Sequence, residues 1–313
     1  MTKNIEFRNL EGFVIGSFNA MASPCEVLIE TSNLALARSV CEAVYIEAKR
    51  IERKYSRYRD DNIIFDINHA KGKPITVDEE TAQLIDFADF CHQSSNGLFD
   101  ITSGVLGTIW RFNGGNTIPV KKAINNLLPK IGWNKVDWSK PTLKMPKGMN
   151  IDLGGFGKEY AVDRSMAIAQ SITNLPMLIN FGGDIIANKP PTIKPHWIVG
   201  IEPIALEQKP PPSIQLGFGA IATSGDSKRY LTHNGAILSH VLNPTTGYPI
   251  EQAPASVTVM AENCTQAGMM ATLAMLQGAQ AETFLQQQEL TYWLQRRNCN
   301  NHTTYASKQD TKA

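Results

Sequence analysis

Hydrophobic residues recur with a helical period in the first part of the chain. Within residues 32–56, an apolar stripe at steps of three or four positions is formed by Leu36, Val40, Val44, Ala48 and Ile51. Residues at these spacings share one face of an α-helix. Because Ser32 and Asn33 are both residue types that cap a helix N-terminus, the sequence predicts a long amphipathic helix that begins after one of them.

The flanking segments have patterns of their own. Residues 13–21 and 25–30 predict two strands around a turn at Ser23-Pro24, and residues 56–62 predict a polar loop. Gly97 can end a further helix in the left-handed conformation. The helix that Gly97 ends is expected near 79–95. A further helix is expected near 120–131, followed by strand-like pieces at 135–138 and 142–145.

The second half of the chain is rich in β-branched and aromatic runs. The expected strands fall within 177–186, 196–202, 213–225, 236–242 and 255–261, and helices are expected only at 158–172 and 265–278. Successive strands with few helices between them favour antiparallel pairing and an α+β fold. The sequence predicts one domain over residues 1–298 and a polar, frayed tail over 299–313.

Composition narrows the class of protein. The chain has 313 residues, is 42% hydrophobic and carries a formal net charge of +1, so it lacks the basic surplus of a nucleic-acid-binding protein. It has no apolar run long enough for a transmembrane segment, and its charged N-terminus lacks a signal-peptide core, which predicts a cytoplasmic protein. A leader already removed would leave no trace. The five cysteines are far apart and predict buried or idle thiols.

Glycine-rich turns follow several of the expected strands. In IDLGGFGKEYAVDR, residues 151–164, three glycines and Lys158 lead into a helix whose first N–H groups favour an anion such as phosphate. Further glycine-bearing segments are NFGGDI at 180–185, where Gly182 and Gly183 are expected within a strand, and the turns in ATSGDSKRY at 222–230 and SHVLNPTTGYP at 239–249. Neither the P-loop nor the dinucleotide fingerprint fits the first turn. Four such turns predict one convergent ligand cleft.

His240 is the candidate general base. It follows an expected strand, and an unperturbed imidazole is partly neutral near neutral pH, so it can take a proton from a hydroxyl nucleophile. The other interpretation, a histidine satisfied by backbone groups at a strand end, is about equally supported by the motif alone.

Taken together, these motifs resemble the FAD:protein FMN transferases, the ApbE-like flavin transferases, over roughly residues 15–280. The segments that carry the resemblance, in chain order, are NAMASPCEV (19–27), YSRYRDDNIIFDIN (55–68), GLFDIT (97–102), IDLGGFGKEYAVDR (151–164), NFGGDI (180–185), ATSGDSKRY (222–230) and SHVLNPTTGYPI (239–250). The family motif for the fourth segment is D-L-G-[GA]-x-[AG]-K-G-[YW]-x-[VA]-D.

The resemblance implies a fold and a reaction. The fold is α+β, with two intertwined subdomains of mostly antiparallel sheet, packed helices, and FAD in the cleft between them. The reaction cleaves the FAD pyrophosphate, joins FMN through its phosphate to a Thr or Ser hydroxyl of an acceptor flavoprotein subunit, and releases AMP. Family members are often exported.

The resemblance also implies site residues. Those that match FAD contacts are Met21, Tyr58, Leu98, Phe99, Asp100, Asp152, Lys158 and Leu242. The turn formed by Thr223, Ser224, Gly225 and Asp226 lies beside the flavin or its phosphates. His240 is the implied proton acceptor, and Asp226 is assigned to the catalytic residues with it.

One departure concerns the metal. The family binds Mg²⁺ through a backbone carbonyl, here Gly155, and a D-A-x-x-T pattern, but this chain has Gly268 in the aspartate position and keeps only Thr272. Glu262 is a possible substitute from a nearby loop. Two hypotheses follow: a flavin transferase with a weakened metal site, or a non-catalytic FAD- or FMN-binding or delivery protein. An aspartate at position 268 is expected to strengthen the dependence on Mg²⁺.

Overall fold

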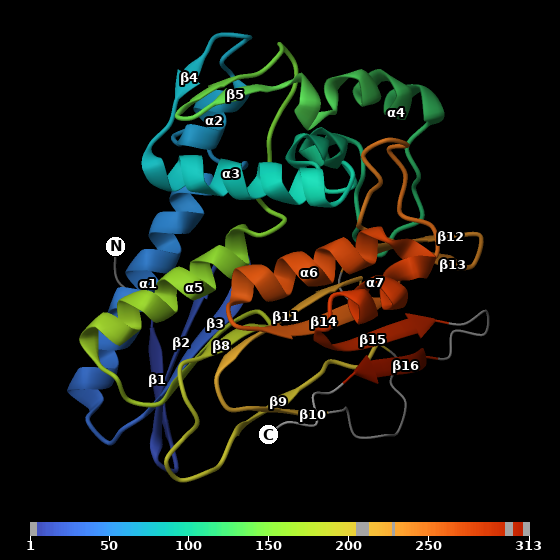
Figure 1. Ribbon diagram of the computed structural model, residues 1–313. Helices are drawn as coiled ribbons and strands as arrows, with labels where there is room; N and C mark the ends of the chain where they lie inside the picture. The colour runs from blue at the N-terminus through green and yellow to red at the C-terminus, as the bar shows by residue number, and fades with distance from the viewer. Residues whose placement is uncertain (1–4, 205–212, 227–228, 298–302, 309–313) are drawn as a thin grey trace.

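A computed structural model describes residues 5–204, 213–226, 229–297 and 303–308, the last of these as backbone only (Figure 1). The chain forms two parts, one above the other in Figure 1. The lower part contains the large sheet with three helices against it, and the upper part contains smaller elements around one long helix.

Within the described residues, the large sheet has nine strands, and every neighbouring pair is antiparallel. Their order across the sheet is β1 (Glu6–Leu10), β2 (Phe13–Ala20), β3 (Ser23–Glu30), β7 (Met177–Phe181), β8 (Asp184–Ala187), β11 (Gly219–Gly225), β14 (Ser256–Ala261), β15 (Thr291–Arg297) and β16 (Thr303–Lys308). This confirms the expected α+β class with antiparallel pairing.

Both faces of this sheet are covered. One face carries α1 (Leu34–Tyr55), α5 (Gly157–Ile172) and α6 (Cys264–Leu276), followed by the short α7 (Ala281–Gln287). The other face is covered by the hairpin of β9 (Trp197–Gly200) and β10 (Ser213–Leu216). Neighbouring residues of a strand point to opposite faces: Val14 packs into the core beneath the helices, while Phe13 packs against Trp197 of the hairpin.

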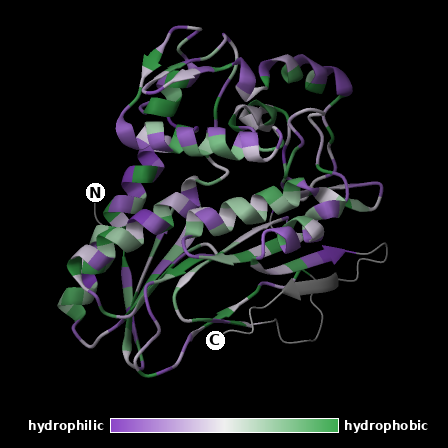
Figure 2. Cartoon of the chain, viewed as in Figure 1, coloured by the Kyte–Doolittle hydropathy of each residue, from purple (hydrophilic) through white to green (hydrophobic). Residues whose placement is uncertain are grey.

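Figure 2 shows the consequence of this packing for the helices: α1 alternates hydrophilic and hydrophobic positions, whereas α6 is apolar or nearly neutral along most of its length. The helix α1 begins after Asn33, whose side chain accepts a hydrogen bond from Leu36 N, so the expected cap is confirmed. Along the expected stripe, Val40, Val44 and Ile51 are fully buried.

The upper part is built from two separate stretches of chain. The first holds α2 (Ile63–Asn68), β4 (Ile75–Thr76), α3 (Glu79–Ser94), a 3₁₀ helix (Ile101–Thr108), α4 (Lys121–Leu127), two 3₁₀ turns (Leu128–Lys130 and Trp133–Lys135), β5 (Asp137–Ser139) and β6 (Thr142–Lys144). The second is the hairpin of β12 (Tyr230–His233) and β13 (Ala236–Ser239). Leu231 of this hairpin packs with Leu106 and Trp110, which joins the two stretches. The two parts are therefore intertwined along the chain.

Two turns differ from the prediction. The strands β2 and β3 meet at Met21 and Ala22, with φ of 53° and 56°, and not at Ser23-Pro24. A two-residue hairpin loop with both φ positive matches the strand twist, and Pro24 is placed inside β3. Gly182 and Gly183 likewise form the turn between β7 and β8, not part of a strand, with φ of 61° and 99°.

The structure also tests the predictions for the C-terminal tail and for the cysteines. Residues 303–308 pair with β15 as β16, so the expected fraying is wrong there, while residues 298–302 and 309–313 lie outside the described residues. Four cysteines are free and buried, as expected, and Cys299 lies outside the described residues. Burial raises the pKa of Cys25 to about 11 and those of Cys41 and Cys91 to about 12, so these thiols are inert.

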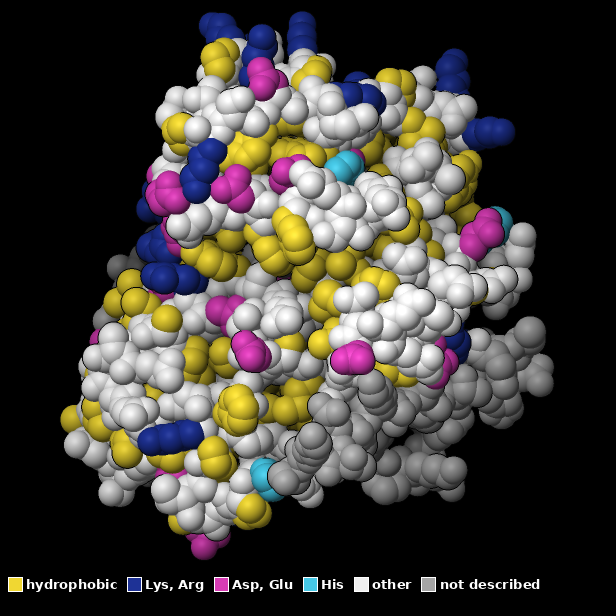
Figure 3. Space-filling model, in the orientation of Figure 1, with side chains coloured by type: hydrophobic (Ala, Val, Ile, Leu, Met, Phe, Trp, Pro, Cys, Tyr) yellow, Lys and Arg dark blue, Asp and Glu magenta, His cyan; other side chains and the backbone are white. Residues whose placement is uncertain are grey.

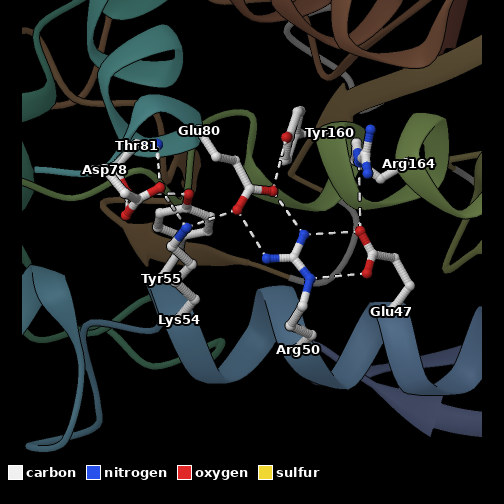
Figure 4. A network of polar contacts seen from close by, with 9 residues as sticks. All are labelled: Glu47, Arg50, Lys54, Tyr55, Asp78, Glu80, Thr81, Tyr160 and Arg164. Carbon is white, nitrogen blue, oxygen red and sulfur yellow. Dashed lines mark hydrogen bonds and ion pairs between the residues drawn. The ribbon is translucent and has the colours of Figure 1, made fainter.

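A network of ion pairs joins the two parts (Figure 4). Arg50 on α1 makes paired hydrogen bonds to Glu47 on its own helix and to Glu80 on α3, at 2.6 to 2.8 Å. Lys54 of α1 and the hydroxyl of Tyr160 on α5 also bind Glu80, at 2.7 and 2.9 Å. Paired, charge-assisted bonds of this kind fix orientation as well as distance. They hold α3 against α1 and α5.

We predict that Glu80→Gln lowers the unfolding free energy by about 1 to 2 kcal/mol near neutral pH, a value discounted for the partial exposure of Arg50. The hydrogen bond from Arg50 lowers the pKa of Glu80 below its usual 4.5. Such a group stabilises the fold above its unfolded pKa, and the contribution is lost as pH falls through the folded pKa. The difference between the proteins should therefore shrink below about pH 4.5.

Urea unfolding at a series of pH values measures this difference. The matched control is Glu79→Gln on the same helix, because that side chain is 67% exposed and pairs with Lys140 at the surface. Equal stability of Glu80→Gln and wild type at neutral pH would contradict the structural role of the network.

Candidate functional site

A cavity of about 150 Å³ lies where the two parts meet. Its lining residues come from the 3₁₀ helix and the segment before it, from the segment before α5, from the segment after β13, and from α6. They are Leu98, Phe99, Asp100, Ile101, Ser103, Gly104, Asp152, Gly155, Leu242, Thr272 and Leu276. Figure 3 shows hydrophobic side chains gathered along the band between the upper and lower parts. The cavity therefore has residues of both parts in its wall.

Asp100 fixes the upper wall of this cavity. Its buried carboxylate accepts hydrogen bonds from the backbone N–H and the hydroxyl of Thr102, at 2.8 and 2.6 Å, and caps the 3₁₀ helix. The second oxygen accepts from the N–H of Trp133 at 2.9 Å. Most of its acceptor capacity is thus used within the protein, which indicates that Asp100 positions the wall.

Asp152 lies at the junction of the two parts and is held on two sides. One oxygen accepts from the N–H of Gly154 at 2.9 Å, and the other accepts from the guanidinium of Arg57 at 2.9 Å. Arg57 also donates to the carbonyl of Gly104 and lies 4.9 Å from the ring centre of Tyr58. The side chain of Tyr58 is 85% exposed, so its outer ring face is free to stack on a ligand.

Gly155 and Thr272 face the cavity from the lower part. A Cβ at Gly155 would lie 3.1 Å from the ring of Phe99, so glycine lets this ring approach the backbone before α5. No backbone N–H of the described residues donates to the Gly155 carbonyl. Thr272 lies on α6 with Leu276 one turn further along, and both contribute to the wall.

Lys158 lies outside the cavity lining. Its ammonium is 2.7 Å from the buried carboxylate of Asp184, at the start of β8. Burial lowers the pKa of Lys158, but the charge of Asp184 outweighs it, and the pKa is above its ordinary value. The lysine is therefore a fixed cation beside the turn between β7 and β8.

The expected turn at 223–226 is mostly strand, because Thr223, Ser224 and Gly225 end β11 and pair with β14, and it lies outside the cavity lining. Thr223 is exposed, and its hydroxyl shares a hydrogen bond of 2.8 Å with Thr258 on β14. Gly225 has no room for a side chain, because a Cβ would lie 2.7 Å from Ser256. Asp226 is buried and pairs with Arg297 of β15 at 2.7 Å. Burial raises its pKa, and the charge of Arg297 opposes this shift.

His240 follows β13, two residues before Leu242 of the cavity wall. Its Nδ1 atom is buried and has no hydrogen-bond partner among the described residues, and its ring lies 6.3 Å from that of Phe112. Burial and the positive charge of Arg229 lower its pKa to about 4, against a hydrogen bond to the Arg229 backbone. The imidazole is therefore neutral, with a free acceptor, over the physiological pH range.

The structure thus brings part of the predicted site together. The predicted residues in the cavity wall are Leu98, Phe99, Asp100, Asp152, Gly155, Leu242 and Thr272. The predicted residues outside it are Met21, Tyr58, Lys158, Thr223, Ser224, Gly225, Asp226 and His240. Met21 lies in the turn between β2 and β3, where its N–H donates to Glu52 at 2.8 Å.

Sequence reasoning missed two residues near the cavity. Arg57 was seen only as part of a polar loop, although it orients Asp152. Glu159 is the other: its carboxylate lies between α5 and α6 with a buried Oε2 atom, and burial, with the nearby charge of Asp184, raises its pKa. The available signal was a charged residue at the position where the motif D-L-G-[GA]-x-[AG]-K-G-[YW] has glycine.

The described residues contain no helix long and apolar enough to cross a membrane. They also contain no cluster of three or more His, Cys, Asp or Glu side chains arranged to hold a metal ion. A metal held by one carboxylate, a hydroxyl and a backbone carbonyl needs no such cluster.

The fold and the cavity define a two-part α+β protein with a ligand cavity at the junction. A sequence model of the ApbE family matches residues 21–294, and the chain belongs to this family. A protein from Klebsiella pneumoniae named FAD:protein FMN transferase is 29% identical over 260 residues, which cover 81% of this chain and 79% of that protein. One of the same name from Haemophilus influenzae is 26% identical over 90% of this chain and 85% of its own.

Solved structures are similar over nearly the whole chain. The crystal structure of the ApbE protein from Thermotoga maritima matches with a TM-score of 0.82 and 27% identity, over 96% of this chain and 97% of that one. The flavin transferase ApbE from Vibrio cholerae also matches with a TM-score of 0.82, over 98% of this chain and 99% of its own. Its identity is 21%, so this likeness concerns the fold.

We predict that one imidazole of the folded protein titrates near pH 4 and that this signal is absent from His240→Asn. Because the unfolded histidine has a pKa near 6.5, the unfolded state binds the extra proton first, and His240 should reduce stability progressively as pH falls from 6.5 toward 4. Proton NMR of the histidine ring resonances measures the titration. A His240 signal that titrates near 6.5 would show that the ring is solvated.

Proposed function

We propose that this chain is an FAD:protein FMN transferase that cleaves the pyrophosphate of FAD and attaches FMN through its phosphate to a Thr or Ser hydroxyl of an acceptor flavoprotein subunit. The bond between the two phosphates breaks, a phosphorus–oxygen bond to the acceptor oxygen forms, and AMP leaves. The observation that carries the proposal is the cavity between the two parts, whose wall contains residues of four family motifs. The names of the relatives support the same activity.

The walls of the cavity suit the two ends of such a substrate. Phe99, Leu98 and Leu242 provide apolar surface for an aromatic ring system, with Tyr58 exposed nearby on the loop that carries Arg57. The turn before α5 presents backbone groups and the positive end of the helix dipole, which favour phosphate. We therefore place the flavin against the upper wall and the diphosphate against α5 and α6.

His240 is proposed as the proton acceptor for the incoming hydroxyl. Its buried Nδ1 has no partner, and its lowered pKa keeps the ring neutral, so it needs no prior deprotonation. A low pKa makes it a weak base, and the proton transfer therefore gains most when the phosphorus–oxygen bond is already forming. Asp226, which pairs with Arg297, is proposed to hold the end of β11 against β15.

A magnesium ion is proposed to take part, with Gly155 and Thr272 among its ligands. Both residues line the cavity, and the carbonyl of Gly155 is free of backbone donors among the described residues. A divalent cation bound there would supply charge neutralisation at the reacting phosphates. That the protein acts in the cytoplasm also remains a prediction.

The reaction predicts two products. Incubating the protein with FAD, Mg²⁺ and a flavoprotein subunit that carries a Thr or Ser flavinylation site should release AMP and leave flavin fluorescence on the subunit after denaturing electrophoresis. Tight FAD binding without either product, over a range of divalent ions, would contradict the proposal and favour a flavin-holding protein.

We further predict that His240→Ala slows transfer by about a hundredfold or more while FAD affinity stays within about threefold. The cause is the loss of the proton acceptor, because His240 is outside the cavity lining. The matched control is His233→Ala on the neighbouring strand β12, whose side chain is exposed, and it should retain full activity. Wild-type turnover by His240→Ala would reject the assigned role.

A further inference from the structure

Two departures from the family motifs touch each other in space. A Cβ added to Gly268 would lie 2.5 Å from Cγ and 2.8 Å from Oε1 of Glu159. The carboxyl group of Glu159, on α5, therefore lies beside the backbone of α6 at the position where the motif places a carboxylate. An aspartate at position 268 requires the side chain of Glu159 to move, so the expected gain in metal dependence is opposed by a steric cost.

Glu159 is half-buried as a residue, but its Oε2 atom is buried and has no hydrogen-bond partner among the described residues. The two aspartates near Glu159 already have partners of their own. Asp163 accepts hydrogen bonds from the N–H groups of Cys264 and Thr265, at 2.7 and 2.8 Å, and so holds the first turn of α6. Asp184 pairs with Lys158 at 2.7 Å. A buried oxygen atom without a partner calls for a ligand.

The location of this oxygen relates directly to the cavity. Glu159 follows Gly155 by four positions, and Thr272 follows Gly268 by four positions on α6. Residues four apart are neighbours along one face of a helix. The contact between Glu159 and Gly268 is therefore about one helical turn along α6 from Thr272, and Gly155 lies in the turn just before α5.

We propose that Glu159 supplies the carboxylate of the divalent-cation site, together with the carbonyl of Gly155 and the hydroxyl of Thr272. The carboxylate that the motif places on α6 comes in this chain from α5, and glycine at position 268 makes the room for it. This set provides hard oxygen ligands and one negative charge, which suits Mg²⁺ or Mn²⁺. The inference deepens the proposed function, since the cation serves the diphosphate substrate.

Glu262 does not take this role. It lies in the loop between β14 and α6 and is exposed, whereas the side chain of Glu159 lies against α6 and its Oε2 atom is buried. A purely structural role for Glu159, as a neutral group that fills the space beside Gly268, is the alternative that the experiment must separate.

Binding of Mn²⁺ alone, followed by the loss of the free-ion electron paramagnetic resonance signal, tests the proposal without reference to catalysis. We expect Glu159→Gln, which keeps the shape of the side chain, to weaken Mn²⁺ binding roughly tenfold or more. Glu262→Gln is the matched control and should bind Mn²⁺ as wild type does. FAD affinity measured without metal should be unchanged in both variants.

A second variant moves the carboxylate back to α6. In Glu159→Gly combined with Gly268→Asp, the space beside position 268 becomes free, and Mn²⁺ affinity should return to within about threefold of wild type. Gly268→Asp alone should be less stable than wild type, because both side chains then compete for one space. If Glu159 only fills the space beside Gly268, the double variant should not recover Mn²⁺ binding.

Several outcomes would overturn the proposal: no Mn²⁺ binding by wild type at about 1 mM, wild-type affinity in Glu159→Gln, or no binding by a folded swap variant. If Glu159→Gln does not fold, the swap variant decides. Release of AMP by the wild-type protein is scored separately. If wild type releases AMP but Mn²⁺ affinity does not depend on Glu159, only this inference is contradicted. If wild type releases no AMP, the proposed function is contradicted.

Discussion

The position of the cavity depends on how Arg50 holds the two parts of the molecule together. Its guanidinium binds Glu47 and Glu80 with paired hydrogen bonds, and Glu80 lies on α3, the helix whose C-terminal end leads into Leu98 and Phe99 of the cavity wall. Bidentate, charge-assisted pairs fix orientation as well as distance. The spacing between the upper wall and the helices below is therefore set by an interaction outside the cavity.

The first turn of α5 connects this network to the cavity. Successive residues of the turn point in different directions: Lys158 pairs with β8, Glu159 packs against α6, and Tyr160 donates to Glu80 of the network. Gly155, just before the helix, enters the cavity wall. One short segment thus fixes α5 relative to the sheet, to α6 and to the upper part, which explains why its glycines and charges lie so close together in the sequence.

Several parts of this arrangement could be predicted from the sequence. The stripe through Val40 and Val44 predicted α1, and the run of strands in the second half predicted an antiparallel sheet. Local signals sufficed there because they repeat over many residues. The turn at Met21 was missed because its conformation comes from strand twist and pairing, which outweighed the local signal of Pro24.

The site was predicted in part for a similar reason. Motif order led to Phe99 and Thr272, which meet at the cavity, but no local pattern shows that Arg57 would orient Asp152 across the junction. The aspartate missing at position 268 was visible in the sequence, whereas its neighbour Glu159 is more than a hundred residues away along the chain. The hypothesis of a non-catalytic flavin-binding protein rested on that missing carboxylate, and the role proposed for Glu159 would remove the argument for it.

The central claim is that the junction cavity holds FAD, with its diphosphate beside a cation bound by α5 and α6. A crystal structure of the protein with FAD and Mn²⁺ tests it most directly, because Mn²⁺ can be located by its anomalous scattering. The account predicts an anomalous peak in contact with Glu159, Gly155 and Thr272, with the flavin ring against Phe99. FAD bound elsewhere, or a peak remote from Glu159 while FAD occupies the cavity, would contradict it.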